Sequence, residues 1–73
     1  MKKSEVKGTD VIHCETLNEF KRIIKLFKMD GEYLIWDVYK ENTVLYPFSD
    51  KYGEVNGYCK EAGLNVLNST EII

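Results

Sequence analysis

Histidine and cysteine are the side chains of this chain best suited to nucleophilic catalysis or metal binding. His13 and Cys14 are adjacent, and Cys59 lies far along the chain. Because neighbouring strand residues point to opposite faces, His13 and Cys14 cannot easily share one ligand or one proton. A cysteine nucleophile needs a nearby base, and the only pair that could supply both is Cys59 with His13 as its base. Structural zinc commonly takes four ligands at short paired spacings, which this sequence lacks. We predict a protein that is not an enzyme, with no catalytic residue, no metal site and no cofactor.

One aspartate and one group of basic residues each allow two interpretations, a structural one and a functional one. Asp37 interrupts an apolar stretch, and it is either an outward strand residue or a charged point in a binding face. Lys21, Arg22, Lys25 and Lys28 line one side of a predicted helix. They either form a solvated face whose positive charges interact favourably with the helix C-terminus, or they form a patch that binds nucleic acid or an acidic protein. The net charge of −2 counts against strong nucleic-acid binding.

The length and composition of the chain indicate one small domain. The 73 residues leave room for a single domain, which we place at 10–73 after a flexible arm at 1–9. No apolar run is long enough to span a membrane, and the first ten residues lack the apolar core of a signal peptide. We therefore expect a cytoplasmic location with both thiols free.

A strand, a helix and a hairpin are predicted along the first two thirds of the chain. A β-branched run favours a strand at 11–14. Thr16 and Glu19 fit a capping box that begins a helix at 17–29, which Gly31 would close in the left-handed conformation. Aromatic and β-branched residues favour strands at 33–39 and 44–48, joined by a three-residue loop. That register turns one set outward: Tyr33, Ile35, Asp37, Tyr39 and Leu45, opposite a core set of Leu34, Trp36, Val38, Val44, Tyr46 and Phe48.

A helix near 55–62 and a strand at 64–67 complete the expected order, β-α-β-β-α-β. This order is typical of the ferredoxin-like split βαβ fold. We thus expect an α+β domain with an antiparallel sheet and both helices on one face. A simpler hairpin packed on one helix is the alternative.

Three stretches carry a family resemblance: VIHCET at 11–16 followed by Glu19-Phe20, YKENT at 39–43, and YCKEAGLNVLNSTE at 58–71. Together they resemble small accessory proteins of phages and prophages of Gram-positive bacteria. The resemblance implies a host-factor inhibitor in the host cytoplasm, including an anti-defence role, that acts by binding and blocking a host protein.

We expect a non-catalytic protein-binding module that uses the outward set Tyr33, Ile35, Asp37, Tyr39 and Leu45. Large apolar residues on an open sheet face mark interaction sites, and tyrosine is enriched among hot spots. One alternative is nucleic-acid binding through the basic helix face and exposed tyrosines, and another is a small thiol enzyme or redox protein. Self-association into a homodimer through an edge strand is a separate expectation.

Overall fold

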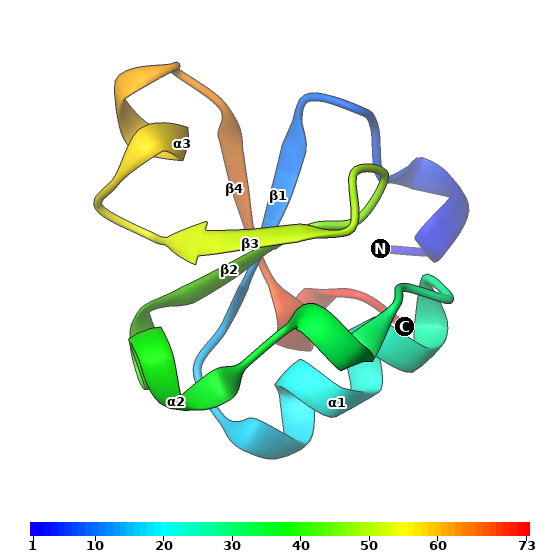
Figure 1. The fold of residues 1–73 in the computed structure, drawn as a ribbon. Helices are drawn as coiled ribbons and strands as arrows, with labels where there is room; N and C mark the ends of the chain where they lie inside the picture. Colours follow the sequence, from blue (N-terminus) through cyan, green and yellow to red (C-terminus); the bar gives the residue numbers. More distant parts are fainter.

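The computed structural model describes residues 1–73 as a small α+β domain, which confirms the predicted class (Figure 1). Four strands and three helices follow one another along the chain. They are β1 (Asp10–Cys14), α1 (Leu17–Leu26), α2 (Trp36–Tyr39), β2 (Thr43–Tyr46), β3 (Lys51–Glu54), α3 (Tyr58–Glu61) and β4 (Asn65–Asn68), with 3₁₀ turns at Lys3–Glu5, Gly31–Tyr33, Lys40–Asn42 and Ser69–Glu71. The strands and the two longer crossovers follow the predicted β-α-β-β-α-β order, with α2 added after α1.

The sheet is mixed, with the strand order β3-β2-β1-β4. β2 runs antiparallel to both β1 and β3, whereas β4 runs parallel to β1 and pairs Val11 with Val66. The expectation of an antiparallel, ferredoxin-like sheet is therefore wrong in its strand directions. The reason is the crossover through α3, which returns the chain to the free edge of β1 in the same direction as β1.

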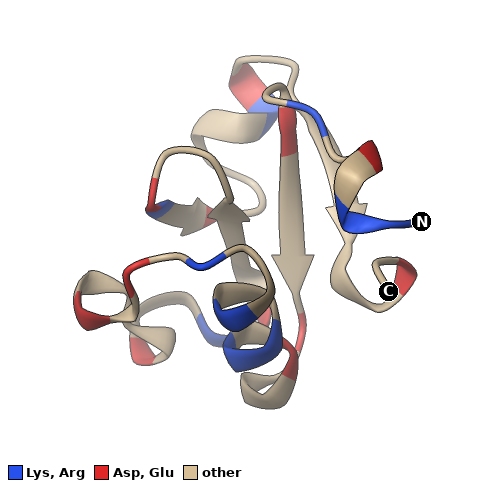
Figure 2. Cartoon of the chain, turned by 90° about the vertical axis from the view of Figure 1, so that its right-hand side faces the viewer, with Lys and Arg blue, Asp and Glu red and all other residues tan.

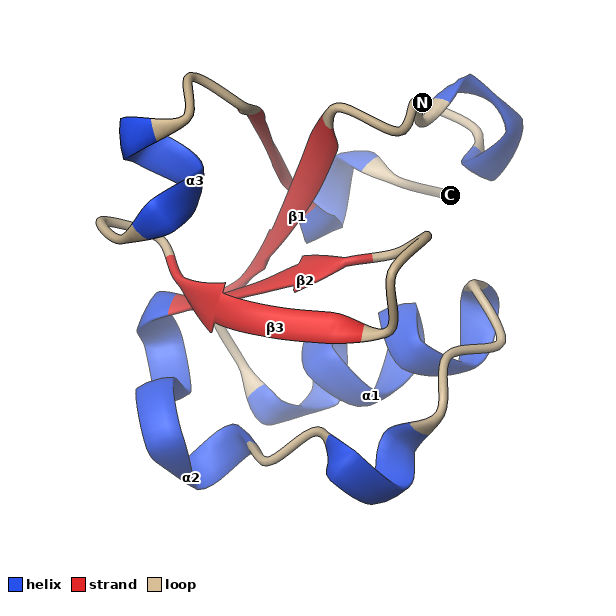
Figure 3. Ribbon diagram, turned by 45° about the horizontal axis from the view of Figure 1, so that its top comes forward, coloured by secondary structure: helices blue, strands red, loops and turns tan.

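Helices cover both faces of the sheet, so the expectation of helices on one face is also wrong (Figure 3). On one face, Ile12, Leu45 and Leu67 join the buried side chains of α1 in the main hydrophobic cluster. On the other, Cys59 of α3 packs with Val11 and Val44 in a smaller cluster. Because β1 is buried on both sides, its near-continuous apolar run carries no simple alternation.

The strand predicted at 33–39 is wrong, because the segment forms a 3₁₀ turn at Gly31–Tyr33 and then α2. The carboxylate of Asp30 accepts a hydrogen bond from the backbone N–H of Glu32 and begins the turn. Moreover, β2 is already paired along both edges, by β1 and by β3. No edge of β2 is left for a strand at 33–39.

The hairpin partner of β2 is β3, which the sequence analysis missed. The turn between them includes a hydrogen bond from the N–H of Ser49 to the carbonyl oxygen of Tyr46, and Asp50 takes a positive φ of 49°. Both faces of β2 are buried, with Val44 in the smaller cluster and Leu45 in the main one. Leu45 is fully buried in the main cluster, so its outward placement is wrong.

Helix α1 begins as predicted and ends three residues earlier than predicted. The hydroxyl of Thr16 accepts a 3.2 Å hydrogen bond from the N–H of Glu19. At the other end, the N–H of Met29 bonds the carbonyl of Ile24 while Lys28 takes a φ of 54°. This is a Schellman ending with lysine at the left-handed position, in place of the predicted Gly31.

Residues 1–9, predicted as a flexible arm, pack against the domain. Val6 is buried in the main hydrophobic cluster. The N-terminal amine donates a 2.8 Å hydrogen bond to the carbonyl of Glu71, and the N–H of Ile73 donates one of 2.8 Å to the carbonyl of Met1. The two ends of the chain therefore lie side by side (Figure 2).

Candidate protein-binding site

An open apolar groove of about 560 Å³ lies between α1 and the segment that follows it. We call it the α1 groove. Leu17, Phe20 and Ile24 form one wall, because residues three and four apart share a helix face. The opposite wall is built from the segment after the helix and consists of Met29, Gly31, Leu34, Ile35 and Trp36.

The Schellman ending of α1 positions this opposite wall. It reverses the chain at Lys28, so that Met29 and Leu34 are buried against the helix. The ring of Trp36 then packs on that of Phe20, with 5.5 Å between the ring centroids. The two walls are thus fixed to each other from below by side chains of the main cluster.

The mouth of the α1 groove exposes large apolar side chains. Ile35 is 52% exposed and Leu17 is 40% exposed. On the same segment as Ile35, Tyr33 and Val38 are also more than half exposed, at 73% and 53%. An apolar surface of this kind, beside polar residues, is typical of an interaction site.

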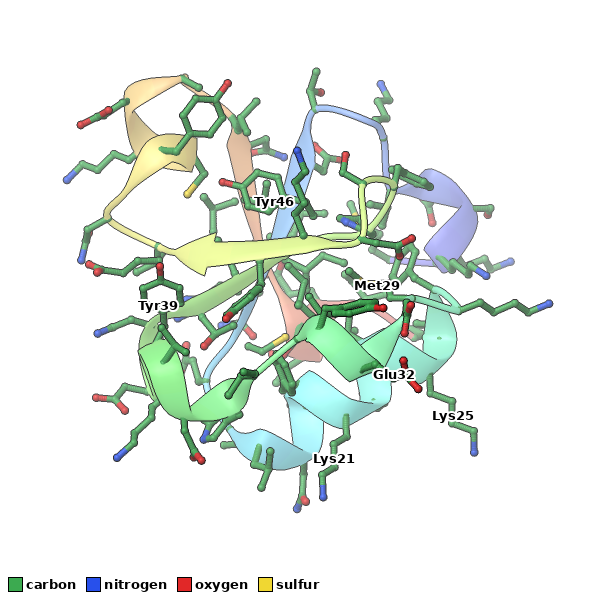
Figure 4. All side chains as sticks on the ribbon, in the orientation of Figure 1. Lys21, Lys25, Met29, Glu32, Tyr39 and Tyr46 are labelled. Atoms are coloured by element: carbon green, nitrogen blue, oxygen red, sulfur yellow. The ribbon has the colours of Figure 1, made fainter.

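The rim of the α1 groove is positively charged. Lys21, Lys25 and Lys28 are exposed, and no aspartate or glutamate lines the groove with them. Figure 2 shows basic segments (blue) on α1, and Figure 4 shows Lys21 and Lys25 extending from the same side of the helix. No ion pair joins any of these three lysines to a carboxylate. The rim therefore carries three cations without a bonded carboxylate.

Arg22, the fourth member of the predicted basic face, does not share this surface. Its guanidinium donates 2.8 Å and 2.9 Å hydrogen bonds to the two carboxylate oxygens of Glu19 and a 2.6 Å bond to the carbonyl oxygen of Ser69. The bonds from Arg22 lower the pKa of the Glu19 carboxyl below its ordinary value, and the carboxylate raises the pKa of the guanidinium. Arg22 is therefore a structural residue that holds the Ser69–Glu71 turn on α1.

The predicted protein-binding residues separate into three groups. Tyr33, Ile35 and Asp37 are exposed, and Ile35 lines the α1 groove together with the predicted lysines. Tyr39 is half-buried and packs edge-on against Tyr52, with the ring centroids 5.7 Å apart. Leu45 belongs to the core. The structure thus brings one residue of the apolar prediction beside three of the basic prediction.

A second hollow, of about 640 Å³, was missed by the sequence analysis. Four of the five tyrosines line it around β3: Tyr39, Tyr46, Tyr52 and Tyr58. Burial, followed by the nearby Cys59 and Tyr58, raises the pKa of Tyr46 above its ordinary value. The spacing of these tyrosines gave no signal, because they meet only through the β2–β3 hairpin. This tyrosine hollow lies apart from the lysines of the α1 groove.

The cysteines and the histidine do not form a reactive pair. Burial is the first cause that raises the pKa of the Cys14 thiol to about 12, with Glu19 second. Cys59, on the opposite sheet face, donates a hydrogen bond of 3.4 Å to the carbonyl of Val55. Nε2 of His13 is 2.6 Å from the carbonyl oxygen of Glu41. Burial accounts for Cys14, and hydrogen bonds account for Cys59 and His13, so each of the three side chains has a structural role.

No cluster of three or more His, Cys, Asp or Glu side chains is arranged to hold a metal ion. None of the helices combines the length and the apolar character needed to cross a bilayer. No protein-family model, curated protein or solved structure matches the chain. The site must therefore be interpreted from its own geometry.

Proposed function

We propose that this protein is a non-catalytic protein-binding module and that the α1 groove is its contact surface. The observation that carries the proposal is the exposure of Ile35 and Leu17 at the mouth of a groove that is also lined by Lys21, Lys25 and Lys28. An apolar centre within a polar rim is the anatomy of protein interfaces.

The energetics support a protein partner. Covering an exposed leucine or isoleucine side chain contributes about 1.5–3 kcal/mol at full burial. Ile35 and Leu17 are each about half exposed, so each has a sizeable part of that contribution still to gain. A partner that fills the groove would also cover the outer edge of Trp36, a residue type enriched among interface hot spots.

The resemblance to phage and prophage accessory proteins supports a more specific role. Such a role is inhibition of a host protein, including a defence enzyme, in the cytoplasm of a Gram-positive host. A small domain that binds through one groove can block a larger protein without any chemistry of its own. No reactive side-chain pair is needed for this role, in agreement with the structural contacts of Cys14, Cys59 and His13.

Nucleic-acid binding is the weaker candidate. It relied on the basic helix face acting together with exposed tyrosines. Lys21, Lys25 and Lys28 line the α1 groove, whereas four of the five tyrosines line the separate hollow around β3. Single-strand binding combines a basic groove with aromatic residues in that same groove. The lysines of the α1 groove and these four tyrosines therefore do not share one surface, as the nucleic-acid candidate required.

The proposal is tested by comparing two isoleucine variants as baits in a lysate of a Gram-positive host. Ile35→Asp places a charge in the α1 groove, and Ile73→Asp makes the same change at a residue that is 81% exposed elsewhere. We expect one host protein to be retained by the wild type and by Ile73→Asp, and to fall about tenfold or more with Ile35→Asp. Equal retention by all three folded baits would contradict the proposal.

A further inference from the structure

The lysines of the α1 groove follow the same helical period as its apolar wall. Leu17, Phe20 and Ile24 lie three and four residues apart, and so do Lys21, Lys25 and Lys28, the last of which lies two residues beyond the end of the helix at Leu26. Each interval of this kind advances about 4.5–6 Å along a helix axis. The groove therefore presents alternating apolar and cationic points at the spacing of helix turns.

The groove is open along its mouth, which favours a macromolecular ligand over an enclosed small molecule. Small-molecule sites bury roughly 70–90% of their ligand. Here Ile35 and Leu17 remain 52% and 40% exposed at the rim. A ligand lying in the groove would keep one side in solvent, as an amphipathic helix does when its apolar face occupies a hydrophobic groove.

The charge pattern determines the chemistry of that ligand. Lys21, Lys25 and Lys28 have no carboxylate among the residues that line the groove. The only ion pair of the protein joins Arg22 to Glu19, and it leaves these lysines free. A helix with glutamates beside its apolar face would supply the complementary charge at matching turns, because its side chains repeat at the same three- and four-residue intervals.

We propose that the α1 groove binds an acidic amphipathic helix of a partner protein, with the apolar face of that helix on Ile24, Ile35 and Trp36 and its carboxylates beside Lys21, Lys25 and Lys28. This inference rests on the proposed function and specifies its partner. The apolar contacts provide most of the affinity, and the lysines provide orientation, association rate and selection against basic helices.

The test uses three synthetic peptides of about 14 residues, a length that spans the ten-residue helix α1 with some overlap. The first has leucines at helical i, i+3, i+4 and i+7 spacing flanked by glutamates. The second replaces each glutamate with lysine, and the third scrambles the first. Affinities are measured by calorimetry for the wild type and for Lys21→Glu/Lys25→Glu. A second double variant, Lys51→Glu/Lys60→Glu, makes the same charge change at exposed lysines outside the α1 groove.

We expect the acidic peptide to bind the wild type and the Lys51→Glu/Lys60→Glu control alike. Binding should weaken about tenfold or more in Lys21→Glu/Lys25→Glu, and that variant should gain affinity for the basic peptide. The affinity of the acidic peptide for the wild type should also fall as salt rises from about 50 to about 500 mM, because exposed charge pairs are screened.

Four outcomes would overturn the inference: no binding of the acidic peptide, equal binding of the scrambled peptide, equal loss in both double variants, or tighter binding of a single-stranded oligonucleotide or phosphatidylserine vesicles at the same lysines. The lysate comparison separates this inference from the function it rests on. If a host protein is lost with Ile35→Asp and the acidic peptide nevertheless fails to bind, the α1 groove is still a protein-binding surface. Its ligand is then not an acidic helix.

Discussion

The rings of Phe20 and Trp36 meet at a centroid distance of 5.5 Å and an interplanar angle of 59°. This contact joins the buried face of α1 to the first residue of α2 and fixes the width of the α1 groove. Phe20 is almost fully buried, and Trp36 is half-buried in the opposite wall of the groove. The stability of the fold and the shape of the candidate site therefore depend on the same aromatic pair.

Replacing Trp36 should accordingly affect stability and binding together. We expect Trp36→Ala to lower the free energy of unfolding by about 2 kcal/mol, below the range for a fully buried tryptophan because the side chain is only partly buried. Trp36→Phe should keep a tilted aromatic contact with Phe20 and lose less than half of that amount. Urea unfolding measures both variants, and a loss as large for phenylalanine as for alanine would contradict the role given to the ring pair.

At Lys28, a single substitution should raise the stability of the fold and weaken the binding of the peptide. Its left-handed backbone, at a φ of 54°, is strained for any residue with a Cβ. Lys28→Gly should therefore raise the free energy of unfolding by about 0.5–1 kcal/mol, after allowance for the added freedom of the unfolded chain. The same variant should bind the acidic peptide more weakly, since one cation of the rim is lost. Thermal unfolding and calorimetry on one sample check both signs, and a less stable variant would contradict the Schellman ending.

Tyr33 and Tyr39 were grouped on one face by the sequence, and the structure distinguishes them. Tyr33 is 73% exposed, so Tyr33→Ala should change the free energy of unfolding by no more than about 0.5 kcal/mol. Tyr39 packs on Tyr52, so Tyr39→Ala should cost about 1 kcal/mol. Chemical denaturation of the two variants side by side makes the comparison, and the reverse order would place Tyr33 in the core.

Stability should fall in alkaline solution. The pKa of Cys14 is raised from 9.0 to about 12 by burial, and that of Tyr46 is raised from 10.0 in the same direction. Both groups hold their protons more tightly in the folded protein, so their contribution is complete below pH 9 and is lost as the pH rises from 9 toward 12. Urea unfolding at stepwise higher pH should show this decline. Free energies that are constant or rising over that interval would contradict the burial of the two groups.

The elements with strong local signals were predicted correctly from the sequence. The start of α1 follows from Thr16, whose hydroxyl caps the helix in a way that depends on neighbouring residues alone. Likewise β1 is marked by its β-branched run and β4 by a short apolar run after Gly63. These signals are local, so no knowledge of the tertiary partners was needed.

The errors arose where tertiary partners decide the structure. The segment 33–39 has a strong strand propensity, yet β2 was already paired on both edges, and propensity yields to such context. The strand β3, KYGE, has only one aromatic residue and a glycine, so its pairing with β2 gave no local signal. Consequently the lysines and Ile35 were each identified, while their meeting in one groove and the convergence of four tyrosines could not be predicted.

The most direct test of the α1 groove as a binding surface is an NMR titration of the ¹⁵N-labelled protein with the acidic peptide. Our account predicts that the largest shift changes include Leu17, Ile24 and Ile35 and the indole N–H of Trp36, all of which line the groove. Lys51 and Tyr58, which line the tyrosine hollow, should serve as unshifted references. Shift changes concentrated around Tyr46, Tyr52 and Tyr58, with the α1 groove unaffected, would contradict the account.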